Sequence, residues 1–139
     1  MASDNKTPSN TPEPGGRGDS IRELTRKIVE FRDARNWRQF HNPKDLAISI
    51  SLEAAELLEV FQWSGADTCA GTDRKMAKVR EELADVLIYS LLMADDLGLD
   101  VTEIVSRKLE ANGRKYPADR AWGKSDKYTA YLPDEGDQK

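Results

Sequence analysis

The sequence predicts an all-α protein whose chain forms a four-helix bundle. Apolar residues recur with the 3.6-residue period of an amphipathic helix through four segments. Helix-capping motifs precede three of these segments, and no run alternates apolar and polar residues as a half-buried strand would. These observations favour helices packed on helices over a fold that contains a sheet.

Each predicted helix has local signals for where it begins or ends. Ser20 stands three residues before a glutamate, and so does Asp100, so both are capping boxes. Asn42 is an N-cap placed before Pro43, whose missing N–H is harmless at the first helical position. Gly98 stops the third helix. The four predicted helices span, in order, residues 21–35, 43–63, 73–97 and 101–112.

The chain has the length of one domain with polar ends. Residues 1–18 are rich in proline, glycine, serine, threonine and asparagine, so we expect a disordered tail. The helical domain is expected over residues 19–122, and residues 123–139 are expected to be a flexible C-terminal tail, because no periodic pattern continues there.

Composition excludes several classes of function. The net charge of −4 and the scattered basic residues argue against a nucleic-acid-binding protein. Cys69 is the single cysteine and His41 the single histidine, which excludes an internal disulfide and common zinc motifs. The N-terminus lacks an apolar signal region, and no segment is long enough to span a membrane. A cytoplasmic protein is therefore expected.

Two pairs of carboxylates lie on apolar helix faces. Glu53 and Glu56 belong to the second predicted helix, and Glu82 and Asp85 to the third. Each pair is spaced i, i+3, which places both members on one side of a helix. An isolated pair of this kind is usually solvated, but these pairs share their stripes with leucine, isoleucine and valine. Buried carboxylates repel one another, so the sequence predicts a divalent metal site of the Mg²⁺ or Mn²⁺ type.

Aromatic and basic residues stand close to the acidic helices in the sequence. For each aromatic residue core packing is the more common role, but together they could form stacking faces for a nucleobase. Lys108 and Asn112 share a stripe of the fourth helix, where a cation and an amide could contact phosphate oxygens; a lysine that extends to solvent is the alternative. The aromatic residues and the histidine are Trp37, Phe40, His41, Trp63 and Tyr89.

These segments together resemble a known family. E-x-x-E followed after a long gap by E-x-x-D is similar to the pattern of the MazG-like superfamily of all-α nucleoside triphosphate pyrophosphohydrolases. The wider match resembles the dCTP pyrophosphatase branch, although relatives in that branch can carry a histidine where this chain has Ile28. The matching segments are NWRQFHNPKDL, EAAELLEVFQW, EELADVLIY and KLEANGRKYP.

The resemblance implies an Mg²⁺-dependent enzyme, in which Mn²⁺ can substitute, that hydrolyses a deoxynucleoside triphosphate to the monophosphate and pyrophosphate. dCTP or a modified dCTP is the implied substrate, and the implied assembly is a homo-oligomer, usually a tetramer. The implied metal ligands and catalytic residues are Glu53, Glu56, Glu82 and Asp85. The implied substrate contacts are Trp37, Arg38, Gln39, Phe40, His41, Trp63, Tyr89, Lys108 and Asn112.

Two other interpretations stay open at this stage. The same metal site would serve the same reaction on another or a damaged deoxynucleotide. Alternatively, the chain could be a non-catalytic oligomerisation module in which the acidic pairs form structural salt bridges. The candidate partners for such salt bridges are Arg26, Arg32, Arg35 and Arg80.

Overall fold

The computed structural model describes residues 20–131, and within them the only secondary structure is helical. The all-α fold class is therefore confirmed, while the expected tail at residues 1–18 lies outside the described part of the chain. None of the described helices is both long and apolar enough to cross a bilayer. The elements are α1 (Ile21–Asp33), η1 (Trp37–Phe40), α2 (Pro43–Glu59), α3 (Asp73–Asp96), α4 (Val101–Lys115), α5 (Ala118–Ala121) and η2 (Tyr128–Tyr131).

The N-termini of the four long helices are capped by side chains. Ser20, Asn42, Thr72 and Asp100 each accept a hydrogen bond from the backbone N–H three residues later, at 3.0–3.2 Å. Each cap satisfies one of the donors that a helix start leaves unpaired. The caps of α1, α2 and α4 confirm the sequence analysis.

The second helix is shorter than we predicted. α2 ends at Glu59 instead of continuing to Trp63, and the residues between form a tight turn. The N–H groups of Phe61 and Gln62 bond to carbonyls three residues back, and Trp63 has a φ of 66°. A residue in this left-handed conformation cannot continue a right-handed helix, so Trp63 lies beyond the end of α2.

The fourth helix is longer than we predicted. α4 continues through Gly113 to Lys115, and the N–H of Tyr116 still donates to the carbonyl of Asn112 at 2.8 Å. Glycine lowers helix stability by only about 1 kcal/mol relative to alanine, which does not end a helix on its own. Pro117 follows directly and supplies the stop.

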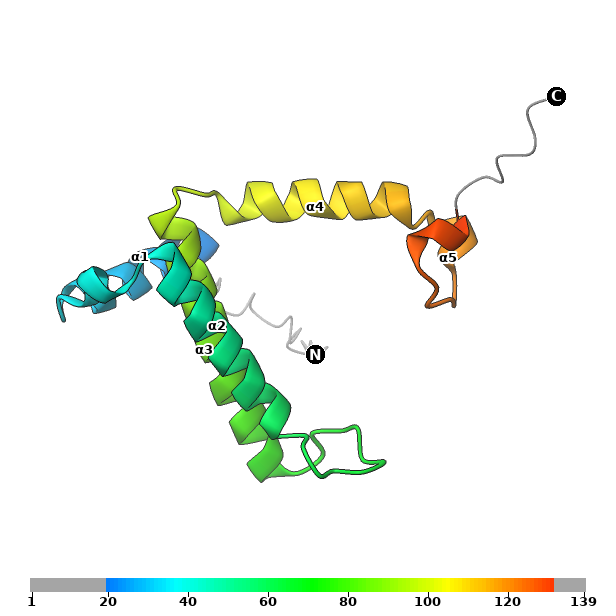
Figure 1. Ribbon diagram of the computed structural model, residues 1–139, viewed down its shortest axis with the longest axis horizontal. Helices are drawn as coiled ribbons and strands as arrows, with labels where there is room; N and C mark the ends of the chain where they lie inside the picture. The colour runs from blue at the N-terminus through cyan, green and yellow to red at the C-terminus, as the bar shows by residue number, and fades with distance from the viewer. Residues whose placement is uncertain (1–19, 132–139) are drawn as a thin grey trace, which may run out of the picture.

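The packed part of the chain is formed by three helices. α2 and α3 run antiparallel and side by side over most of their length, and α1 packs against α3 near the end that leads to α4 (Figure 1). The most buried apolar side chains are Leu46 on α2 and Leu91, Leu92 and Ala94 on α3. The packing of α2 against α3 therefore determines how the faces that carry the carboxylates are oriented toward each other.

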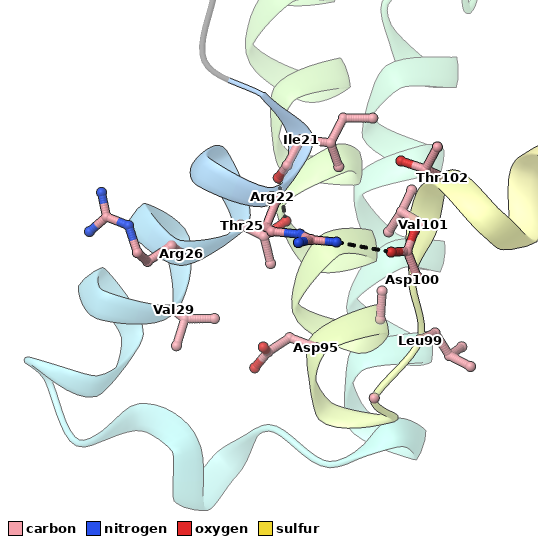
Figure 2. A pocket seen from close by; sticks show the side chains of 12 residues that line it. Ile21, Arg22, Thr25, Arg26, Val29, Asp95, Leu99, Asp100, Val101 and Thr102 are labelled. Atoms are coloured by element: carbon pink, nitrogen blue, oxygen red, sulfur yellow. Dashed lines mark hydrogen bonds and ion pairs between the residues drawn. The ribbon is translucent and has the colours of Figure 1, made fainter.

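The fourth helix stands apart from the other three. α4 extends away from the α2–α3 pair and carries α5 at its far end (Figure 1). Gly98 adopts a φ of 64° in the turn after α3, and the ion pair of Arg22 with Asp100 spans the α1–α4 junction at 3.3 Å (Figure 2). Ile104 and Leu109 on α4 remain 42% and 64% exposed. One chain therefore does not close the expected four-helix arrangement, because the apolar face of α4 finds no partner helix within residues 20–131.

Residues that we expected in the C-terminal tail include a packed turn. Tyr131 in η2 is buried, and its ring lies 6.0 Å from that of Tyr116 in an edge-to-face arrangement. Nη1 of Arg120 donates to the carbonyl of Tyr131 at 2.8 Å. Aromatic pairs and single hydrogen bonds produce no periodic pattern in a sequence, so periodicity does not reveal such a turn.

One charged side chain of α1, that of Arg32, is buried. The side chain of Arg32 is 1% exposed, its Nε donates to Asp33 at 2.8 Å, and its Nη1 lies 3.7 Å from Asp95 on α3. Nη1 and Nη2 have no hydrogen-bond partner within the described residues. Phe31, the preceding residue, is half exposed, and the guanidinium group of Arg35 stacks on its ring.

We expect the charge of Arg32 to contribute little to stability. Arg32→Met keeps most of the buried volume and removes an under-satisfied cation, so the free energy of unfolding should stay within about 1 kcal/mol of wild type. Asp95→Ala instead leaves the buried cation short of a counter-charge, and should lower the free energy of unfolding by about 1–3 kcal/mol. Urea denaturation measures both. A larger loss in Arg32→Met than in Asp95→Ala would contradict this interpretation.

Candidate metal centre

Three of the predicted carboxylates converge between α2 and α3. Glu53, Glu82 and Asp85 each offer an oxygen, and these oxygens all lie within 4.8 Å of one another. Glu82 is 5% exposed, and the other two side chains are half-buried. The convergence follows from the apolar stripes, because the faces that pack α2 on α3 are the faces that carry these residues.

The surroundings of Glu53 disfavour its charged form. Burial raises the pKa of Glu53, and the charges of Glu56, Asp85 and Glu82 raise it further. A cation among the three oxygens would remove this repulsion. A half-buried set of carboxylate oxygens suits a hard divalent ion and not zinc or copper, which favour nitrogen and sulfur ligands. The described residues therefore fit a metal ion.

Glu56 does not belong to this group of three. It is exposed on α2, and it lines a neighbouring pocket instead. Residues spaced i, i+3 differ by about 60° around a helix axis, so one member of a pair can face the partner helix while the other turns toward its edge. The expectation that all four carboxylates point inward is therefore not met by the geometry of one chain.

Tyr89 on α3 lies near the carboxylates, and His41, which follows η1, packs against it. Their rings are 6.2 Å apart and edge-to-face, although the whole of α2 lies between them in the sequence. Burial raises the pKa of Tyr89, with smaller contributions from the charges of Glu53 and Asp85. Nδ1 of His41 is buried and has no hydrogen-bond partner within the described residues. The structure thus brings a ring pair with an unpaired nitrogen to the edge of the acidic cluster.

The other predicted base contacts are exposed in one chain. Trp37 and Phe40 lie in η1 with 43% and 61% of their surface exposed, and Trp37 packs edge-to-face on Phe31. Arg38 is also exposed, and Gln39 donates its side-chain amide to the backbone of its own turn. Trp63, at the opposite end of α2, is 92% exposed.

The predicted phosphate contacts are not brought to the cluster by the fold of one chain. Lys108 is exposed and Asn112 is half-buried, and both lie on α4, which extends away from α2 and α3 (Figure 1). A second copy of the chain would have to bring this helix to the carboxylates. The helical stripe that predicted these residues gives no information about which chain they face.

The sequence analysis missed a cation beside the cluster. Nζ of Lys78 lies 3.2 Å from Oε1 of Glu82 and 2.9 Å from Oε2 of Glu81. These hydrogen bonds, first that to Glu81 and then that to Glu82, raise the pKa of Lys78. The i, i+4 spacing of Lys78 and Glu82 was the available signal, but this spacing is common on solvated helix faces.

Lys78 also lines a pocket that shares a wall with the cluster. The pocket has a volume of about 470 Å³ and lies between the C-terminal half of α2 and the N-terminal half of α3. Its charged lining residues are Glu56, Glu59, Arg74, Lys75, Lys78 and Glu82.

Residues 20–131 are helical and hold a carboxylate cluster between two antiparallel helices. These features are those of an all-α protein with a candidate metal centre. The MazG-like family model matches residues 48–130. The chain is 38% identical to human dCTP pyrophosphatase 1 over 122 residues, which cover 86% of this chain and 69% of that protein, and 35% identical to the mouse protein over 123 residues with the same coverage. The protein belongs to the MazG-like family, which confirms the resemblance.

A solved structure agrees with this assignment. The crystal structure of a pyrophosphatase from Archaeoglobus fulgidus matches with a TM-score of 0.63 and 45% sequence identity. The match covers 73% of this chain and 95% of the archaeal chain. The similarity in sequence and in structure therefore extends over nearly the whole of that protein.

Proposed function

We propose that this protein hydrolyses deoxynucleoside triphosphates to the monophosphate and pyrophosphate, with dCTP or a modified dCTP as the preferred substrate. The convergence of Glu53, Glu82 and Asp85 carries the proposal, because it supplies a site for the metal that such a reaction needs. The curated mammalian relatives are dCTP pyrophosphatases, which supports the choice of substrate. As part of this proposal, we also place the protein in the cytoplasm.

The three carboxylates would hold Mg²⁺, or Mn²⁺ in its place, with Glu56 as an additional ligand at the edge. When bound, the ion neutralises phosphate charge and polarises the phosphorus–oxygen bonds. The chain itself contributes a fixed position for the triphosphate and carboxylate oxygens able to orient a water molecule opposite the leaving group. Packing of α2 on α3 holds these oxygens in place, so little reorganisation is needed during the reaction.

The base would be held beside the ring pair of His41 and Tyr89. The imidazole of His41, whose buried Nδ1 has no hydrogen-bond partner within the described residues, is the candidate for a polar contact with the edge of the base. Stacking on an aromatic ring contributes about 1–3 kcal/mol and accepts every base, so identity must come from such polar contacts. Trp37 and Phe40 would add stacking surface, and Arg38 and Gln39 would line the same side. Trp63 lies at the opposite end of α2, so it would reach the base from a second copy of the chain.

We also propose that the working form is a homo-oligomer, with a tetramer as the expected state. Leu83 and Leu87 on α3 are 44% and 54% exposed, and Leu52 on α2 is 58% exposed. These faces and the apolar side of α4 expose several large apolar side chains in one chain, and contiguous exposed apolar surface is typical of a site of protein–protein contact. A second copy would cover them and could bring Lys108 and Asn112 toward the phosphates.

One assay tests the activity against its alternatives. The protein is incubated with Mg²⁺ and a panel of dCTP, dTTP, dUTP, dATP and 5-substituted cytosine analogues, and released pyrophosphate is measured. Highest turnover on a cytosine deoxynucleotide supports the proposal. Highest turnover on dATP would show a different substrate, and no pyrophosphate from any nucleotide would favour the oligomerisation module.

The ion pairs already count against that module. Arg26 pairs with Glu30, and Arg32 pairs with Asp33 and Asp95, so the arginines of α1 bind carboxylates outside the cluster. Structural salt bridges would have placed a cation on each of the three converging carboxylates, whereas within residues 20–131 only Glu82 among them forms an ion pair, with the half-exposed Lys78.

Base choice can be separated from base affinity with two variants. His41→Ala should narrow the ratio of kcat/KM between dCTP and dTTP, because it removes the polar contact that distinguishes them. Trp63→Ala should raise KM for both nucleotides by a similar factor, about tenfold, because stacking does not discriminate between bases. Steady-state kinetics on both substrates measure this. A change of preference in Trp63→Ala with none in His41→Ala would contradict the assignment.

A further inference from the structure

The pocket beside the carboxylate cluster combines cations with the N-terminus of a long helix. α3 begins with Asp73 after the N-cap Thr72; Arg74 and Lys75 follow in the same turn, and Lys78 lies one turn later. Cations in the first turn oppose the helix dipole, so they do not stabilise the helix that carries them. A bound anion would be attracted both by these cations and by the helix terminus.

Lys78 occupies the position where the pocket meets the metal centre. Its Nζ lies 3.2 Å from Oε1 of Glu82, the most buried of the converging carboxylates, and its side chain is 56% exposed. Lys78 therefore places a positive charge beside the cluster. If a divalent ion were bound to the Glu82 oxygen, Lys78 would keep its exposed pair with Glu81, at 2.9 Å, and a phosphate in the pocket could take the place of that pair.

The other cations of the pocket differ in how firmly they are held. Lys75 is fixed by the preceding loop, because its Nζ donates to Asp67 at 2.8 Å and to the carbonyl of Cys69 at 3.2 Å. Arg74 is exposed and makes no ion pair within residues 20–131. Arg74 is thus available to a ligand as it stands. Lys78 can reach a ligand by exchanging its contacts with Glu81 and Glu82, while Lys75 is held by the loop.

We infer that this pocket binds the two terminal phosphates of the substrate and the pyrophosphate that leaves, with Lys78 as the principal contact. The inference rests on the proposed function, because the pyrophosphate is the leaving group of the proposed reaction. It assigns that leaving group to one particular side of the metal centre. Glu56, Glu59 and Glu82 also line the pocket and would repel a bare anion. The pocket therefore takes the phosphates together with the divalent ion, and its volume of about 470 Å³ lies in the range of small-molecule sites.

The experiment measures binding of inorganic pyrophosphate in the presence of Mg²⁺ by titration calorimetry. Lys78→Met should weaken binding by about tenfold or more, the usual effect of losing one charge-assisted hydrogen bond, and Lys78→Arg should restore most of it. Arg74→Met should weaken binding less. Arg80→Met removes the same charge from the same helix outside the pocket, and binding should be unchanged.

Two further measurements separate this inference from simpler explanations. Mn²⁺ binding without pyrophosphate should be unchanged or tighter in Lys78→Met, because the lysine competes with the ion for Glu82, whereas loss of a ligand in Glu82→Gln should weaken it. Hydrolysis of the nucleotide panel by wild type is measured in parallel. If wild type hydrolyses nucleotides and Lys78→Met binds pyrophosphate as tightly as wild type, the pocket assignment is wrong. If wild type binds pyrophosphate through Lys78 but hydrolyses no nucleotide, the pocket is supported and the proposed reaction is wrong.

Discussion

Glu53→Gln and Asp85→Asn are each expected to lower turnover of the best nucleotide by at least about 100-fold, the scale of losing one key electrostatic contact in an active site. Each substitution keeps the shape of the side chain and removes one charge from the three converging oxygens. The measurement is pyrophosphate release at saturating Mg²⁺ and nucleotide. Glu110→Gln, which removes an exposed carboxylate from α4, serves as the control and should keep wild-type turnover.

Glu53→Gln should not lower the free energy of unfolding, although it lowers turnover. The raised pKa of Glu53 means that the folded chain disfavours its charge, so at neutral pH the charged form lowers the free energy of unfolding. Without metal, Glu53→Gln should therefore unfold at the wild-type temperature or above it. Mg²⁺ should raise the unfolding temperature of wild type more than that of the variant, because an ion stabilises only the state that binds it. Wild-type turnover in either variant, or in excess EDTA, would refute the metal centre.

The second large effect concerns assembly. Leu83→Glu combined with Leu87→Glu should convert the proposed oligomer into smaller species, because the two side chains lie one turn apart on an exposed apolar face of α3. A carboxylate buried at an interface without a partner costs several kcal/mol, so dissociation should increase by more than about 100-fold. Light scattering at micromolar concentration measures the mass. Turnover should fall together with the measured mass if another copy supplies part of the site.

The control for assembly adds negative charge to the same helix without removing an apolar contact. Arg80→Glu lies on α3 at an exposed position and should leave the mass unchanged. Circular dichroism should show full helix content in both proteins, because Leu83 and Leu87 are not core residues of one chain. A wild-type protein that scatters as a monomer at micromolar concentration would contradict the proposal.

Local signals in the sequence predicted much of the secondary structure. The caps at Ser20, Asn42 and Asp100 lie where the hydrogen-bonding side chains indicated, because a cap depends only on residues within one turn. The ends of α2 and α4 were predicted less well. Trp63 adopts a left-handed conformation and Gly113 continues a helix, and both outcomes depend on surroundings that local propensity does not include.

The sequence by itself determined that this protein is all-α, and that Glu53, Glu82 and Asp85 lie on the faces that pack, because helical periodicity links each position to a direction around the axis. Only the tertiary structure decided that Glu56 stays outside their cluster, that Lys78 pairs with Glu82, and that α4 leaves the other helices. The physical reason is that periodicity gives the angle of a side chain on its own helix. The distance to a group on another helix depends on the turns between helices and on which chain supplies the partner. The periodicity of apolar residues contains neither kind of information.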